Sequence, residues 1–172
     1  MKYLEYNINK LKESIESVKI NLKCRKKITD FTRKRKLTPK NLILYTLNNR
    51  GKTTKMELYD FIKEAGIDDV TDSALLQQRE KLNEEVFKEL SNQSLRAFYE
   101  KFPNEVKTLK GKYVLMSIDG SDCEIPNTKE TRERYQSINS TDNDRVARIK
   151  LSNCYDLLNK YVLDTEIEEY KH

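Results

Sequence analysis

The sequence predicts an α+β protein in which helices come first and three strands follow. Two observations lead to this prediction. Apolar residues recur with helical spacing as far as Phe102, and the pattern becomes that of extended strands from Tyr113 onward. The length of 172 residues suffices for one domain, or for a small domain and part of another. We expect an amphipathic helix over 1–22, a basic helical domain over 23–103 and a strand domain over 104–172.

Charge is distributed unevenly along the chain, and the formal net charge of +5 understates the asymmetry. Residues 19–55 contain 13 basic side chains and a single acidic one, Asp30, whereas residues 56–172 contain 17 basic and 24 acidic side chains. A basic block of that density attracts a polyanion, and nucleic acid is the commonest one. The basic side chains are densest over Lys23 to Lys36, called the basic block below. A solvated surface run and a nuclear localisation signal are the alternative interpretations of this block.

The cysteines and the histidine exclude several classes of site. Cys24, Cys123 and Cys154 have no paired spacing, and the only histidine is His172. An odd number of cysteines without a signal peptide favours a reducing cytoplasm. Because the single histidine is the last residue, the sequence does not provide the histidines needed for zinc sites or for Ser/His and Cys/His catalysis. Carboxylate and metal chemistry is the enzyme option that remains. No apolar run approaches membrane-spanning length, so we expect a cytoplasmic protein without a membrane partner.

The first segment is predicted to be one amphipathic helix. Its apolar residues recur at alternating spacings of four and three, which places them on one face. We expect this face to pack on a neighbouring helix, and a coiled coil with a partner chain is the alternative. The residues of this face are Leu4, Ile8, Leu11, Ile15, Val18 and Leu22.

Short helices follow the basic block, and local signals delimit the first two. Thr38 and Pro39 cap and open a helix that Gly51 stops. The tetrapeptide at 54–57, Thr-Lys-Met-Glu, is a capping box that opens a second helix, and Gly66 closes that helix.

A third helix is expected over 74–82, capped by Ser73 or Asp72. The segment 83–102 continues as helix, with a break at 91–92 and an end at the following proline.

Three short helices with a basic lead-in suit a DNA-binding bundle of the helix-turn-helix type. The loop at 65–72 is longer than the tight turn of that motif, so a looser variant is expected. The residues expected to contact DNA are Arg33, Lys34, Arg35, Lys36, Lys40, Arg50, Lys52, Gln77, Gln78 and Lys81.

The third helix is the candidate for reading DNA bases. On a helical wheel its buried side is marked by Leu75, Leu76 and Leu82. Arg79 falls near that side, while Gln77 and Lys81 point away from it. Glutamine can read adenine edges, and lysine can reach guanine or phosphate. A plain amphipathic helix without DNA contacts is the alternative interpretation.

The carboxyl-terminal part is expected to contain three strands, at 113–119, 146–158 and 161–167. A polar surface loop is expected over 124–144 and a two-residue turn at 159–160. The first strand would be buried and would end in Asp119, where a carboxylate can bind a hard divalent cation. An Asp-Gly pair on its own is more often a turn. Three strands leave an edge and a face uncovered, so we expect the missing elements of the domain after Ile167.

Two further aspartates beside the expected hairpin, Asp156 and Asp164, are predicted to be solvated and to bind no metal.

Six stretches in a fixed order carry a family resemblance. Together they resemble the amino-terminal part of a DDE transposase of the insertion-sequence-four family, found in bacterial mobile elements, from about Asp30 to the end. The stretches are Phe31-Thr-Arg-Lys-Arg-Lys-Leu37, Asn41-Leu-Ile-Leu-Tyr-Thr-Leu-Asn-Asn-Arg-Gly51, Glu57-Leu-Tyr-Asp-Phe61, Ser73-Ala-Leu-Leu-Gln-Gln-Arg79, Ile118-Asp-Gly-Ser121 and Leu151-Ser-Asn-Cys-Tyr-Asp-Leu-Leu-Asn-Lys160.

The resemblance implies a helical domain that grips the terminal inverted repeats of the element, followed by a ribonuclease-H-like catalytic domain. In such enzymes three carboxylates bind two divalent ions, Mg²⁺ or Mn²⁺, that activate water and then a DNA 3′-hydroxyl for attack on phosphodiesters. Asp119 matches the first carboxylate, as a catalytic residue and metal ligand. The second aspartate and the glutamate are lacking from the 172 residues, so the ribonuclease-H-like domain would be incomplete.

The sequence therefore predicts a transposase fragment that binds double-stranded DNA at transposon ends and is catalytically silent alone. It would hold no metal stably, would be associated with the bacterial nucleoid, and would have the full-length transposase as a candidate partner. A small DNA-binding regulator without catalytic lineage is one alternative. An assembly protein that uses its first helix for association is the other.

Overall fold

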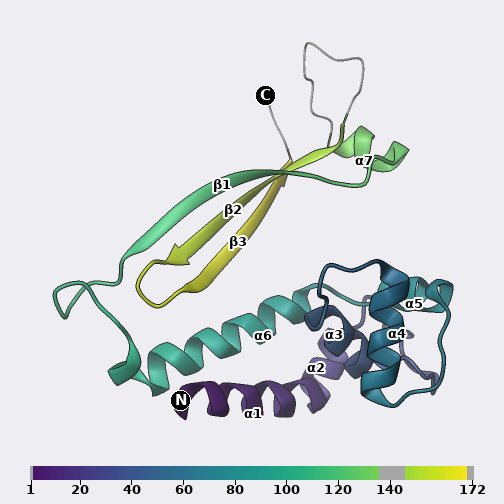
Figure 1. Cartoon of the computed structure of the whole chain (residues 1–172), viewed down its shortest axis with the longest axis horizontal. Coiled ribbons are helices and arrows are strands. Elements are labelled where there is room, and N and C mark those ends of the chain that lie inside the picture. The colour runs from purple at the N-terminus through teal and green to yellow at the C-terminus, as the bar shows by residue number, and fades with distance from the viewer. Residues whose placement is uncertain (1, 136–145, 170–172) are drawn as a thin grey trace. The chain divides into compact units, whose positions relative to one another are not determined.

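The computed structural model describes residues 2–135 and 146–169 (Figure 1). The chain divides into two compact units, Met1–Lys101 and Phe102–His172. The first unit consists of helices and the second contains a three-stranded sheet, so the α+β class predicted from the sequence is confirmed. Residues 1–22 belong to the same unit as the helices that follow them. Within the described part of the chain, no helix has the length and apolar character needed to cross a membrane.

The segment predicted as one amphipathic helix forms two helices, α1 (Lys2–Glu16) and α2 (Val18–Lys23). Ser17 separates them because its side-chain oxygen accepts a hydrogen bond from the backbone nitrogen of Ile20, at 3.2 Å, and so caps α2. This interruption divides the predicted apolar face. Ile15 is buried as expected, whereas the exposed members of the face are Leu4, Ile8, Val18 and Leu22.

The apolar pattern predicted that Leu4 would be buried, but Tyr3 is buried instead and Leu4 is exposed. The Tyr3 ring packs against Phe98 with 4.9 Å between the ring centroids, and its hydroxyl donates a 3.1 Å hydrogen bond to the carbonyl oxygen of Ser94. An aromatic side chain with a polar tip is suited to such a partly buried position. These contacts hold α1 alongside α6 (Glu85–Arg96), as Figure 1 shows.

The next two helices begin and end near their predicted signals. In α3 (Pro39–Leu47), Thr38 is the N-cap and accepts a 3.2 Å hydrogen bond from the backbone nitrogen of Asn41. The helix ends before Gly51 is reached. In α4 (Thr54–Ala65), Gly66 has the left-handed conformation, with φ of 62°, that closes the helix as predicted.

Two helix signals were placed wrongly. Thr71, and not Ser73 or Asp72, caps α5 (Asp72–Arg79), accepting a 3.2 Å hydrogen bond from the backbone nitrogen of Ala74. The break predicted at 91–92 is absent, because α6 continues to Arg96 and runs on into a π-helical turn, η1 (Ala97–Lys101). Burial of its apolar face outweighs the weak helix propensity of a Ser-Asn pair.

The core of the helical unit contains apolar residues from α1 to α6 and from both ends of the basic block. It consists of Ile15, Ile20, Cys24, Leu37, Leu42, Ile43, Tyr45, Leu58, Phe61, Leu75, Leu82, Val86 and Leu90. Because Cys24 and Leu37 are part of this core, the chain between them is fixed to the helices at both ends.

In the second unit, β1 (Met116–Glu124), β2 (Arg148–Asp156) and β3 (Tyr161–Glu169) form an antiparallel sheet in the order β1-β2-β3. A short 3₁₀ helix, η2 (Pro103–Glu105), precedes the sheet. The segment predicted as a loop over 124–144 contains a helix, α7 (Lys129–Arg134), and its residues 136–144 lie outside the described residues.

The first strand differs from its prediction in position and in burial. It begins at Met116 and continues through Asp119 and Gly120, and most of its residues are exposed, with Ile118 at 78%. The Asp-Gly pair does not turn because both residues pair with β2, Asp119 opposite Asn153. Pairing over nine residues outweighs the local turn preference.

The β2–β3 connection contains four residues, 157–160, rather than the predicted two. Asp156 organises this turn and is fully buried, which corrects the prediction of a solvated side chain. Its Oδ1 atom accepts hydrogen bonds of 3.0 Å from the backbone nitrogens of Leu158 and Asn159, and its Oδ2 atom accepts one of 2.7 Å from the Asn159 side chain. Asp164 is exposed, as predicted.

Candidate nucleic-acid interface

Most of the basic block forms a loop, residues 25–36, that is hydrogen-bonded to the segment that follows α5. The backbone nitrogen of Lys26 donates to the carbonyl oxygen of Lys81, at 3.1 Å, and that of Asn83 donates to the carbonyl oxygen of Cys24, at 2.8 Å. Together with the buried Leu37, these bonds hold the loop against α5. We call residues 25–36 the basic loop.

A turn within the basic loop accounts for the single acidic residue of the block. The Asp30 carboxylate accepts a 2.8 Å hydrogen bond from the backbone nitrogen of Lys27, and the Thr32 hydroxyl donates one of 2.9 Å to the carbonyl oxygen of Thr29. Phe31 is half-buried against the core with a φ of 56°. The turn therefore uses the carboxylate of Asp30 internally and leads directly into Arg33.

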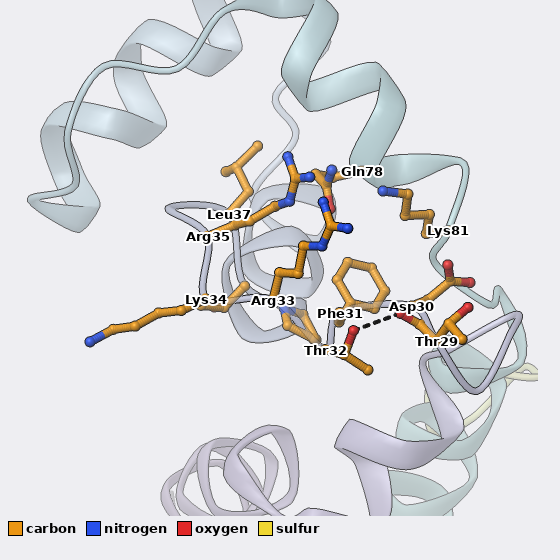
Figure 2. A pocket seen from close by; sticks show the side chains of 12 residues that line it. Thr29, Asp30, Phe31, Thr32, Arg33, Lys34, Arg35, Leu37, Gln78 and Lys81 are labelled. Carbon is orange, nitrogen blue, oxygen red and sulfur yellow. Dashed lines mark hydrogen bonds between the residues drawn. The ribbon is translucent and has the colours of Figure 1, made fainter.

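A cavity of about 670 Å³ lies between the basic loop and α5 (Figure 2). The guanidinium groups of Arg33 and Arg35 lie beside Gln78, and the ammonium group of Lys81 points toward the same space, whereas Lys34 points away. Within residues 2–135 and 146–169, none of these four cations forms an ion pair. The cavity is thus strongly positive.

A second hollow, of about 430 Å³, adjoins the first on the amino-terminal side of α5. The two share Arg35 and Gln78, and the second adds Gln77 and Thr71. The structure therefore brings seven of the predicted DNA-contacting residues to the two hollows beside α5. They are Arg33, Lys34, Arg35, Lys36, Gln77, Gln78 and Lys81.

The buried face of α5 contains different residues from those that the helical wheel predicted. Leu75 and Leu82 are buried as predicted, but Leu76 is 50% exposed and Arg79 is also exposed. Gln78, which we expected at the DNA surface, is 4% exposed. The spacing of three and four residues from Leu75 to Gln78 to Leu82 is the helical signal that would have placed Gln78 inward.

Four of the predicted DNA contacts, including Lys36 beside the second hollow, are already paired with acidic residues. Lys36 lies 3.5 Å from Asp68, and Lys40 pairs with Glu16, whose pKa is lowered by the hydrogen bond from that lysine. These pairs join positions that are far apart in sequence. The sequence could identify the cations but not their acidic partners.

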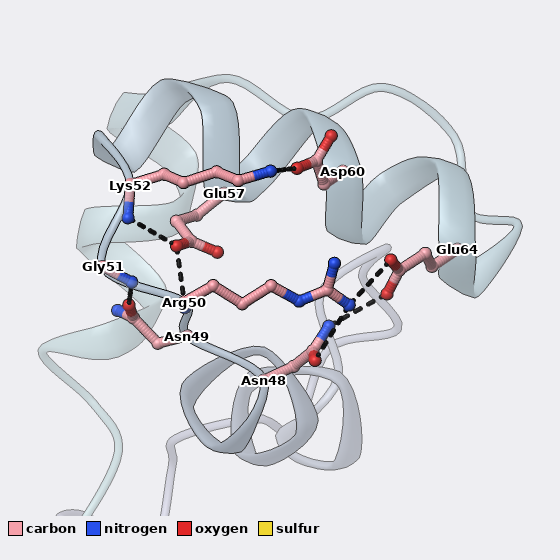
Figure 3. Close-up of polar contacts among 8 residues, drawn as sticks. All are labelled: Asn48, Asn49, Arg50, Gly51, Lys52, Glu57, Asp60 and Glu64. Carbon is pink, nitrogen blue, oxygen red and sulfur yellow. Dashed lines mark hydrogen bonds and ion pairs between the residues drawn. The ribbon is translucent and has the colours of Figure 1, made fainter.

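Arg50 and Lys52 bind carboxylates of α4, as Figure 3 shows. Arg50 pairs with Glu64 at 2.9 Å and Lys52 pairs with Asp60 at 2.6 Å, and the hydrogen bond from Lys52 lowers the pKa of Asp60. Both cations therefore stabilise the α3–α4 connection, and their charge is largely compensated.

The capping box predicted at 54–57 does not form. Thr53 is the N-cap and its side chain makes no capping hydrogen bond. Glu57 instead accepts hydrogen bonds from the backbone nitrogens of Arg50 and Lys52, both at 2.8 Å (Figure 3). The carboxylate of Glu57 therefore accepts hydrogen bonds from the backbone of the loop before the helix, and not from the N-cap residue of the helix.

Asp119 lies in the middle of β1 with its side chain exposed. Its cross-strand neighbour Asn153 accepts a 2.8 Å hydrogen bond from Thr165 on β3. In the part of the chain that the structure describes, no three His, Cys, Asp or Glu residues lie close enough together to bind a metal. A single carboxylate does not fit the three-carboxylate set that holds two divalent ions, so we assign no catalytic step to it.

No protein-family model matches the chain, and no match is found among curated proteins or solved structures. The resemblance to a transposase thus stays a prediction from sequence motifs.

Proposed function

We propose that the helical unit binds double-stranded DNA with the surface formed by the basic loop and α5. One observation carries this proposal. Arg33, Lys34, Arg35 and Lys81 lie on one surface, and none of them has an acidic partner among the residues that the structure describes. The sequence motifs support terminal inverted repeats of an insertion sequence as the DNA.

Unpaired cations are the ones that contribute to phosphate binding. A lysine or arginine that neutralises a phosphate releases condensed counterions, which favours binding most at low salt. A cation already paired with a carboxylate, such as Arg50 with Glu64, must give up that partner first. We therefore place the main electrostatic contribution in the basic loop and not in the α3–α4 connection.

Gln77 is the residue best placed to contact base edges. Its side chain is exposed and lines the second hollow beside the basic loop. A glutamine amide can form two hydrogen bonds with adenine in the major groove. The basic loop would position the duplex through its phosphates, and Gln77 would supply sequence preference.

The proposal covers DNA binding and not strand transfer. A chain that binds transposon ends without cutting them would compete with a full-length transposase for the same DNA, which makes that enzyme a proposed partner at the DNA.

The proposal is tested by fluorescence anisotropy with a terminal-repeat duplex and a random duplex of equal length, at several salt concentrations. The test variant replaces Arg33, Lys34 and Arg35 by glutamine. The control variant removes the same charge from α1, at Lys2, Lys10 and Lys12, which line neither the cavity nor the second hollow among the described residues.

A plot of log K against the logarithm of the salt concentration is linear, and each phosphate contact contributes about 0.9 to the magnitude of its slope. The test variant should therefore reduce the magnitude of this slope by up to about 2.7. The α1 control should leave it close to wild type. Equal effects of the two variants would show that the basic loop is not the interface. Equal affinity for terminal-repeat and random duplexes would refute the assignment to transposon ends.

A further inference from the structure

The side chain of Gln78 is buried and forms no hydrogen bond with any residue that the structure describes. Three polar residues are buried in the described part of the chain, namely Glu57, Gln78 and Asp156. Glu57 accepts hydrogen bonds from the α3–α4 loop and Asp156 accepts them from the β-turn. Gln78 as a residue is 4% exposed, and its side-chain amide has no such bond with any described residue. A buried amide is normally satisfied by protein, water or a bound ion, so the Gln78 amide is free to bind a group that enters the cavity.

The position of Gln78 indicates what that group is. The residue lines both the cavity and the second hollow, and Figure 2 shows its amide beside the guanidinium groups of Arg33 and Arg35. Two guanidinium groups close together repel each other, and an anion between them offsets this repulsion by attracting both. Lys81 adds a third cation directed into the same space.

The remaining polar groups of the cavity are compatible with an anion. The Asp30 carboxylate is its only acidic lining group in the described residues, and it accepts a hydrogen bond from the backbone of Lys27. The Thr38 oxygen accepts a hydrogen bond from Asn41 and its hydroxyl hydrogen remains available as a donor. The cavity therefore offers an excess of donors to a ligand with several acceptor oxygens.

We propose that this cavity binds one phosphate group of the DNA backbone. The amide nitrogen of Gln78 donates a hydrogen bond to a phosphate oxygen, while Arg33, Arg35 and Lys81 neutralise the charge. This inference rests on the proposed function, because it takes the phosphate from the DNA that the basic loop binds. It also assigns different roles to two adjacent glutamines: Gln78 holds the backbone and Gln77 reads the bases.

The experiment is nuclear magnetic resonance on the full ¹⁵N-labelled chain. The side-chain amide signals of Gln78 are assigned by their absence from the spectrum of Gln78→Leu. Inorganic phosphate is added at constant ionic strength against chloride, and duplex DNA is added in a second titration. The side-chain signals of Gln77 are the internal control.

Inorganic phosphate should shift the Gln78 side-chain signals to saturation and leave those of Gln77 unchanged, and the duplex should shift those of Gln78 in the same direction. If the duplex shifts backbone signals of residues 33–36 but neither ligand moves Gln78, the phosphate subsite is wrong and the proposed function stands. If phosphate moves Gln78 but a bound duplex does not, the cavity is a site for free anions and the DNA assignment is overturned. If the duplex shifts no signal, the proposed function fails.

A charge variant supplies an independent readout. Gln78→Glu keeps the shape of the side chain but puts a carboxylate beside Arg33 and Arg35, in the position proposed for the phosphate. We expect a higher Tm, because the arginines gain a partner, together with at least tenfold weaker binding to terminal-repeat and random duplexes alike. Wild-type affinity of Gln78→Glu for both duplexes would overturn the inference.

Discussion

The Oε1 atom of Glu57 lies 2.8 Å from the backbone nitrogen of Lys52, and the same oxygen accepts a 2.8 Å hydrogen bond from the backbone nitrogen of Arg50. Gly51 between them has a φ of 76°, a conformation that glycine adopts without strain. One buried carboxylate therefore fixes the connection between α3 and α4.

Replacement of Glu57 by alanine should lower the free energy of unfolding by about 1–3 kcal/mol, because two backbone donors lose their charged acceptor. Urea denaturation of the full chain measures this change. Glu57→Gln keeps a side-chain oxygen that can accept both bonds, so its loss should be smaller. An alanine variant as stable as wild type would show that water replaces the carboxylate without cost.

The helix boundaries show which parts of the fold the sequence can predict. Thr38 and Gly66 act on the backbone within a few residues of themselves, and both were predicted in their observed roles. Glu57 was expected to cap its own helix, but tertiary packing turned it toward the preceding loop. The first strand was expected to end at Asp119, and pairing with a strand about 30 residues away extends it through Gly120 to Glu124. Local signals fail where a distant segment offers a better partner.

Glu89 on α6 should make the stability of the helical unit depend on acidic pH. Hydrogen bonds from Lys23, Lys19 and Gln93 lower its pKa from the usual 4.5 to about 2. Because the folded-state pKa is depressed, the stabilisation by Glu89 is fully present above about pH 4.5. It is lost as the pH falls toward 2.

Glu89→Gln should therefore cost about 1 kcal/mol at neutral pH, as expected for partly exposed ion pairs, and almost nothing near pH 2. Urea denaturation of both proteins from pH 7 to pH 2 measures the difference. Other carboxylates with lowered pKa values, such as those of Glu16 and Asp60, are common to both proteins and cancel. A difference that is independent of pH would contradict the role of the ion pairs.

Paired and unpaired cations should differ in their effect on DNA affinity. Arg35→Gln removes a charge without an acidic partner among the described residues, so it should weaken duplex binding about threefold or more at 0.1 M salt. Lys52→Gln removes a charge that Asp60 already compensates, and its effect should be smaller. Anisotropy titrations of the two variants side by side test this. A larger effect of Lys52→Gln would move the interface to the α3–α4 connection.

The sequence predicts that the candidate interface is positively charged, but it does not predict which of its cations are paired with acidic residues. The basic block is visible in the sequence, but the pairing of Lys40 with Glu16 or of Lys36 with Asp68 joins residues 24 and 32 positions apart. Such partners follow from the packing of helices and not from local pattern. The inward position of Gln78 is consistent with helical periodicity. That its side chain has no hydrogen-bond partner among the described residues becomes visible only in three dimensions.

Asp156→Ala should destabilise the sheet unit by about 2 kcal/mol, because the backbone donors of Leu158 and Asn159 lose a buried acceptor. Amide hydrogen exchange in β2 and β3 should become faster. Asp156→Asn keeps one acceptor oxygen and should lie between alanine and wild type. The control Asp122→Ala removes an exposed carboxylate from β1 and should change stability by less than about 0.5 kcal/mol. Equal exchange in Asp156→Ala and Asp122→Ala would contradict this account of the turn.

Asp119→Ala should change neither folding nor DNA affinity, because the side chain is exposed on β1 and makes no hydrogen bond with any described residue. The purified chain should also fail to nick a terminal-repeat plasmid with Mg²⁺ or Mn²⁺. In-line displacement by two ions requires several carboxylates that converge, and Asp119 has no such companions in residues 2–135 and 146–169. Asp122→Ala is the control for loss of an exposed charge on the same strand. Nicking that depends on Mn²⁺ and disappears in Asp119→Ala, but not in Asp122→Ala, would show that this chain assembles a catalytic metal site.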